Sequence, residues 1–100
     1  MTDVARTELG RIAVSRAALG RLVVRAAEQV DGARVIRPRR SLRIALEGGA
    51  ARVTLELAAR RGKVLPDLAR AVQAKVTEAL ETMLEVRVDA VDVSVEEVEH

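Results

Sequence analysis

The chain contains no cysteine, phenylalanine, tyrosine or tryptophan, and its single histidine, His100, is the last residue. Without cysteine there can be no disulfide, no thiol nucleophile and no cysteine-ligated zinc or iron–sulfur cluster. The chain has no aromatic ring to stack on a nucleic-acid base, cage a methylated cation or anchor it at a membrane interface, which weakens the case for functions that depend on such rings. A lone terminal histidine is a poor basis for catalysis. The sequence therefore predicts a domain that is not an enzyme and carries no cofactor or metal.

Aliphatic residues supply the apolar content instead. Hydrophobic residues make up 49% of the 100 positions, which is enough for one core, and the chain is too short for two. No stretch approaches the about 18 apolar residues of a spanning helix, and residues 1–6 lack the apolar core of a targeting signal. We expect one cytoplasmic domain over residues 8–98, with residues 1–7 and 99–100 flexible. It would reach a membrane only through a partner, without direct insertion.

The net charge of +2 is unevenly distributed along the chain. Residues 1–63 hold 14 of the 17 basic and 6 of the 15 acidic residues, a formal charge of +8, whereas residues 64–100 carry −6. Such asymmetry predicts either a basic face for an anionic partner or an attraction between oppositely charged faces of two copies.

The first half of the chain predicts a short strand followed by a helix. Residues 10–14 alternate in polarity, and Ser15 is placed to cap the helix that follows. Apolar residues then recur at helical spacing over residues 16–30, and Gly32 is suited to the left-handed conformation that ends a helix. Gly20 inside this helix suggests the close approach of a neighbouring element.

The remainder predicts a hairpin, a longer helix and a final strand. Residues 33–40 are expected to be a basic connection that touches the core through Val35 and Ile36. Residues 41–47 and 52–60 alternate around Gly48-Gly49, which is typical of a β-hairpin. A helix begins at Pro66, and the last strand, residues 91–96, needs a bulge near Asp89-Ala90 because its valines change parity there. The helix has the predicted apolar stripe Leu65, Leu68, Val72, Val76, Leu80 and Met83.

This order, β-α-β-β-α-β, predicts an α+β fold. We expect a two-layer sandwich with two helices on one face of a mostly antiparallel sheet.

Two charged clusters are the remaining candidates for ligand binding in the sequence. Serines 15, 41 and 94 have no histidine to act as a base, and the glycines do not form a phosphate loop. An acidic run could attract a divalent cation weakly, or it could simply keep an edge strand soluble; it comprises Asp89, Asp92, Glu96, Glu97 and Glu99. The candidate site for an anionic partner is a basic cluster made of Arg34, Arg37, Arg39, Arg40 and Arg43.

Two interpretations of the basic cluster remain open. Neighbouring arginines can clamp the phosphates of RNA or of an anionic surface, although the Gly-x-x-Gly clamp of a KH domain is absent. Alternatively, these arginines are solvated and pair with acidic residues of the same or a neighbouring molecule.

The motifs in this order resemble the bacterial alkaline shock protein family, also called the envelope stress response family. The resemblance extends over residues 8–98 and rests on the segments Gly10-Arg11-Ile12-Ala13-Val14-Ser15, Val30-Asp31-Gly32, Leu65-Pro66-Asp67-Leu68-Ala69, Met83, and the closing Val88, Val91, Val93 and Val95. It departs from the family pattern at Ala58-Ala59-Arg60, where members often carry a tyrosine.

The resemblance implies a small, non-enzymatic cytoplasmic protein linked to cell-envelope or alkaline stress. It implies no catalytic, cofactor or metal residues. On this basis we expect an interaction or scaffold protein that self-associates as an oligomer or docks to a membrane-anchored partner. The alternative is an RNA- or anionic-surface-binding module that uses the Arg34–Arg43 cluster.

Overall fold

The computed structural model describes residues 4–6, 13–84 and 86–99. Helices and strands follow in the order β1 (Val4–Arg6), β2 (Ala13–Ser15), α1 (Arg16–Glu28), β3 (Ala33–Val35), α2 (Pro38–Ser41), β4 (Arg43–Glu47), β5 (Ala50–Arg60), α3 (Leu65–Leu84) and β6 (Arg87–Glu99).

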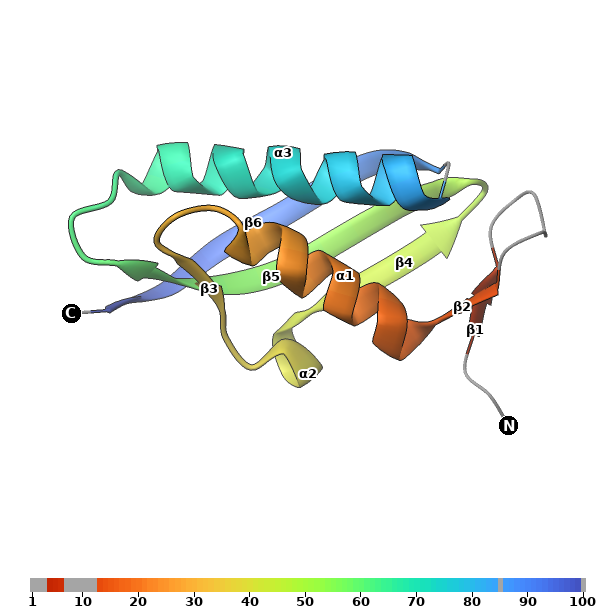
Figure 1. Ribbon diagram of the computed structural model, residues 1–100, viewed down its shortest axis with the longest axis horizontal. Helices are drawn as coiled ribbons and strands as arrows, with labels where there is room; N and C mark the ends of the chain where they lie inside the picture. The colour runs from red at the N-terminus through yellow and green to blue at the C-terminus, as the bar shows by residue number, and fades with distance from the viewer. Residues whose placement is uncertain (1–3, 7–12, 85, 100) are drawn as a thin grey trace.

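The long strand β5 organises the main sheet. Strands β4 and β3 pair antiparallel with successive parts of one edge of β5, and β6 runs parallel to it along the other edge. Helices α1 and α3 lie side by side over one face of this sheet (Figure 1). The predicted α+β fold, with two main helices on one face, is therefore confirmed.

The N-terminal strand differs from the prediction. Residues 10–12 lie outside the described residues, and Ala13–Ser15 form β2, which pairs with β1 in a separate two-stranded sheet. The predicted flexible ends also fall largely on residues outside the described part, at 1–3, 7 and 100. That prediction stays a prediction.

The segment expected as a basic connection forms two further elements. Strand β3 pairs with the end of β5, and Pro38 starts the one-turn helix α2 because its ring fixes a helical φ where no amide is needed. Val35 and Ile36 are buried, as predicted.

The β4–β5 hairpin confirms the strongest local signal in the sequence. Glu47 pairs with Ala50, so Gly48 and Gly49 are the two central residues of the turn. Their φ angles of 59° and 76° are both positive, as in a type I′ turn, and glycine adopts this conformation without strain.

Strand β6 contains the bulge that its valine pattern requires. Val88 lies opposite Ala51 and Ala90 opposite Arg52, so Asp89 is the additional residue. A second shift in register occurs between Leu57 and Ala58. The strand is longer than the predicted residues 91–96 because it pairs along the whole of β5.

The two long helices are positioned by a cap and by an apolar stripe. The hydroxyl of Ser15 accepts a hydrogen bond from the amide of Ala18 at 3.0 Å, which confirms the predicted cap. In α3 the buried stripe is Leu68, Val72, Val76, Leu80 and Leu84. Met83 was predicted to face the core but is 59% exposed. The buried residues of α3 follow one another at intervals of four, which places Leu84 in the core instead of Met83.

The core is closed by small aliphatic side chains from α1, β5 and α3. Its largest fully buried members are Leu19, Leu55, Leu57, Leu80, Val23, Val53, Val72 and Val76. Gly20 does not mark the close approach expected from the sequence, since a Cβ there would lie 3.7 Å from Leu42 Cδ2, an ordinary contact.

Among the helices of the described residues, none has the length and apolar character needed to cross a bilayer.

Candidate functional site

Two of the five candidate arginines are held by acidic residues. Arg34 forms a forked pair with Glu99, with 2.8 Å between Nη2 and Oε2, and its hydrogen bonds lower the pKa of Glu99. Arg37, whose φ of 44° is left-handed, lies 3.6 Å from a carboxylate oxygen of Glu56. Both arginines thus contribute to contacts between the β3–α2 segment and the β5–β6 pair.

The other three lie on or beside α2. The hydroxyl of Ser41 is buried and donates a hydrogen bond to the carbonyl of Ile36 at 2.7 Å, which closes the turn that carries them. Arg39 and Arg43 line a groove between α1 and β4, whereas Arg40 is exposed outside its lining. The structure therefore brings together only part of the predicted cluster.

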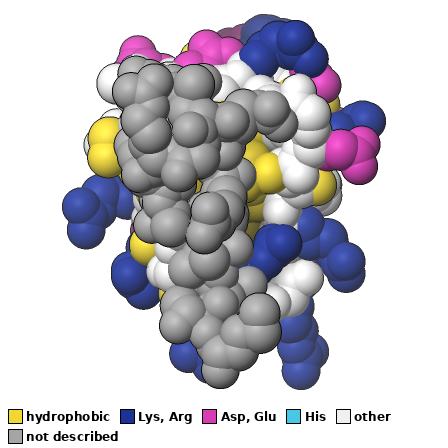
Figure 2. Space-filling model, turned by 90° about the vertical axis from the view of Figure 1, so that its right-hand side faces the viewer, with side chains coloured by type: hydrophobic (Ala, Val, Ile, Leu, Met, Phe, Trp, Pro, Cys, Tyr) yellow, Lys and Arg dark blue, Asp and Glu magenta, His cyan; other side chains and the backbone are white. Residues whose placement is uncertain are grey.

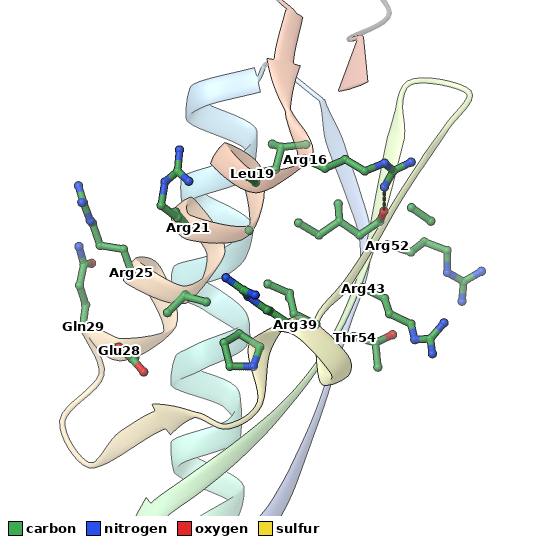
Figure 3. A pocket seen from close by; sticks show the side chains of 17 residues that line it. Arg16, Leu19, Arg21, Arg25, Glu28, Gln29, Arg39, Arg43, Arg52 and Thr54 are labelled. Carbon is green, nitrogen blue, oxygen red and sulfur yellow. Dashed lines mark hydrogen bonds between the residues drawn. The ribbon is translucent and has the colours of Figure 1, made fainter. Parts of the chain in front are cut away.

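This groove, termed the α1–β4 groove, has a volume of about 1500 Å³. Its apolar surface comes from Leu19, Gly20 and Val24 on α1 and from Leu42 and Ile44 beside them. Its lining also includes six arginines: Arg16, Arg21, Arg25, Arg39, Arg43 and Arg52. Figure 3 shows Arg21 and Arg25 on the helix, Arg43 and Arg52 on the strand side, and Arg39 between them.

Four of these arginines were missed from the sequence. Arg16, Arg21 and Arg25 lie on the polar side of the α1 pattern, but only the packing of α1 beside β4 brings them near Arg43. Arg52 lies across the hairpin because it pairs with Ala45. The hairpin register was a usable signal for Arg52, and no local signal placed the helix beside this edge.

Among the described strands, β4 forms the outer edge of the sheet at the groove. The guanidinium of Arg16 donates a hydrogen bond to the carbonyl of Ile44 at 3.3 Å, so this carbonyl points away from β5 (Figure 3). Glu28, the single acidic residue of the described lining, accepts a hydrogen bond from the amide of Val35. The groove thus combines apolar side chains, the outer edge of a sheet and an excess of positive charge.

The acidic run lies at the opposite edge, on β6. Asp89 pairs with Arg87 at 2.9 Å and Glu99 with Arg34, while Asp92 and Glu96 are exposed. A hydrogen bond with Glu96 raises the pKa of Glu56 above its ordinary value, and desolvation adds to this. Within the described residues, no group of three or more acidic, histidine or cysteine side chains could hold a metal ion.

A third charged cluster connects the segment at Gly32 with the end of β5. Lys63 and Arg60 both contact Asp31, at 2.7 Å and 2.6 Å, and hydrogen bonds from them lower its pKa from 3.8 to about 2. The charges are otherwise separated in space. Figure 2 shows the opposite end of the molecule, the right-hand end of Figure 1, where Lys and Arg border the lower half and most of the visible Asp and Glu lie in the upper part.

Solved structures with a similar fold are variants of MamM-CTD. A doubly substituted form has a TM-score of 0.57 and 25% sequence identity, over 84% of this chain and 95% of that chain. The nickel form of another variant has a TM-score of 0.57 and 25% identity, over 83% of this chain and 99% of that one. A cadmium form has a TM-score of 0.57 and 26% identity, over 83% and 96% of the two chains.

No curated protein matches the sequence significantly. The family comparison matches residues 36–100, almost two thirds of the chain, to the alkaline shock protein 23 family, which is described by its "cell envelope-related function". This match agrees with the motifs from Leu65 to Val95 and confirms the resemblance seen in the sequence. The chain belongs to the alkaline shock protein 23 family, which has a cell envelope-related function.

Proposed function

We propose that this protein is a non-catalytic scaffold of the cell envelope that acts by binding other proteins. It self-associates or docks to a membrane-anchored partner, and it acts in the response to cell-envelope stress. The observation that carries the proposal is the separation of charge between the two edges of the sheet. Arginines gather at the α1–β4 groove, and exposed carboxylates follow β6 at the other edge.

Complementary edges favour contacts between copies or with a charged partner. Exposed charges of opposite sign steer two surfaces together and fix their orientation more than they add affinity. Because the chain has no tyrosine or tryptophan to anchor an interface, such contacts would be weak singly and sensitive to salt. The metals named for MamM-CTD are not carried over, since the described residues offer no ligand cluster.

Light scattering coupled to size exclusion tests self-association. We expect the mean mass to rise with protein concentration at low salt and to fall toward the monomer near 1 M salt, where the screening length is about 3 Å. Asp92→Lys on β6 should weaken assembly, whereas Glu78→Lys, an equal charge change at an exposed site on α3, should not. A monomer at every concentration and salt, together with no partner co-purifying from native membranes, would contradict the scaffold proposal.

A second candidate, binding to RNA or anionic surfaces, rests on Arg39, Arg40 and Arg43. The geometry supports it less because Arg34 and Arg37 of the same cluster are engaged by Glu99 and Glu56. Replacing Arg39, Arg40 and Arg43 by alanine should abolish retention on RNA or anionic liposomes if this function is correct. Phosphate binding should also fall steeply with salt. Unchanged retention would exclude it.

A further inference from the structure

We propose that the α1–β4 groove binds an extended segment of a partner protein in which aliphatic and acidic residues alternate. The segment adds a strand to the outer edge of β4. This inference rests on the proposed scaffold function and names the binding surface and the chemistry of the partner.

The edge of β4 supplies the main-chain contacts. The Ile44 carbonyl points away from β5, toward the guanidinium of Arg16. In a strand the amide and carbonyl of one residue point to the same side, so both groups of Ile44 face outward, and the pleat repeats this at Leu46. The amide of Leu42, by contrast, is bonded to the carbonyl of Pro38. An incoming strand can therefore pair with β4 from Ile44 onward, as in other edge-strand recognition.

The two faces of β4 determine which side chains the added strand would carry. Ile44 is half-buried on the helix side, where Leu19 and Val24 also line the groove. Arg43 is exposed on the opposite face, and so is Arg52 of the neighbouring β5. Because successive side chains of a strand alternate between faces, aliphatic residues would point toward α1 and acidic residues toward the arginines.

The positive charge of the groove is available to such a partner. The ion pairs of the described residues involve Asp31, Glu56, Asp67, Asp89 and Glu99, and these do not engage the arginines at positions 21, 25, 39, 43 or 52. The one acidic side chain of the described lining, Glu28, is bonded to the backbone amide of Val35.

The spread of the arginines favours a peptide over a lipid. From Arg16 to Arg25 the helix rises by about 13 Å, and arginines occur along this length as well as on the strand side. A lipid with a single anionic headgroup would require the cations at one end and an apolar remainder. An extended peptide of about four residues spans the same distance, with its acidic side chains on the face of Arg43 and Arg52 and its aliphatic side chains toward α1.

A labelled peptide of about seven residues, alternating valine and glutamate, tests the proposal by fluorescence anisotropy on the full chain. Replacing both Arg43 and Arg52 by alanine should weaken its binding about tenfold, because two exposed charge pairs are lost. The matched control is Arg70→Ala with Lys75→Ala, which removes the same charge from exposed sites on α3. The control should change the affinity less than about twofold.

Two further probes separate strand addition from other forms of binding. N-methylation of the peptide amides that face β4 should abolish binding, since it removes the donors of the ladder. A peptide of the same composition with its valines and glutamates in separate blocks should bind far more weakly. Equal binding of the methylated or block peptide would overturn the proposal, because it would show charge attraction alone.

The remaining outcomes assign the groove to another occupant. If palmitate binds, Gly20→Met abolishes that binding, and the peptide does not bind, the groove is a lipid site and the proposal fails. If the Arg43→Ala and Arg52→Ala pair abolishes self-association while the peptide does not bind, the groove is an interface between copies. In that case the scaffold function stands and only the peptide inference fails, so the two are distinguishable.

Discussion

Replacing Gly20 with alanine should stabilise the protein, although a glycine inside a helix often signals a packing requirement. Gly20 lies inside α1, where glycine costs about 1 kcal/mol relative to alanine. An added Cβ would have Leu42 Cδ2 as its nearest neighbour outside the helix, at 3.7 Å, which is an ordinary van der Waals distance. The helix therefore gains its full propensity with no steric penalty.

The expected gain is about 1 kcal/mol, which for a domain of this size raises Tm by about 4–8 °C. Thermal unfolding followed by far-ultraviolet circular dichroism measures it. The matched control is Gly32→Ala, since Gly32 has a φ of 89° and a Cβ there would lie 2.7 Å from Lys63 Cε. This variant should lose about 1 kcal/mol or more. A lower Tm for Gly20→Ala, or an unchanged Tm for Gly32→Ala, would refute the reasoning.

Three other predictions concern the core and the charged clusters. Leu55→Ala, at a fully buried position in the central strand, should cost about 3 kcal/mol in urea denaturation, and a loss below about 1 kcal/mol would mean that the core collapses around the cavity. The ionised Asp31 stabilises the fold above its ordinary pKa of 3.8, and this contribution is lost as the pH falls through about 2, so Asp31→Asn should flatten the acid limb of a Tm–pH profile. Glu56 has a raised pKa, so its protonation favours the fold at low pH, and Glu56→Gln should raise Tm near pH 7 and reduce the gain seen on acidification.

Local sequence rules predicted the structure correctly wherever a single residue type determines the backbone conformation. Gly48-Gly49 between two alternating runs predicts the hairpin because only glycine takes positive φ twice without strain. The change of parity between Val88 and Val91 predicts the bulge at Asp89, since a regular strand cannot move its apolar side chains to the other face. Ser15 predicts the cap of α1 for an equally local reason.

Prediction failed where the outcome depends on contacts between distant segments. Met83 and Leu84 are both apolar, and only the orientation of α3 against the sheet determines that Leu84 is the buried one. Arg34 belongs to the basic cluster by sequence, yet its partner Glu99 lies 65 residues away. The α1–β4 groove likewise arises from a helix, a turn and two strands, so its arginines could not be grouped by spacing.

The topology explains how a charge asymmetry along the sequence becomes one in space. Helix α3 carries the chain across the sheet, so β6 runs parallel to β5 at the edge opposite β4. Had β6 instead paired with β4, its exposed carboxylates at Asp92 and Glu96 would lie beside Arg43 and neutralise it. The parallel crossover prevents this and leaves these carboxylates at the edge opposite Arg43. An unpaired strand edge is ordinarily protected by charge, and here the arginines that protect β4 from aliphatic strands are the same groups that would select an acidic one.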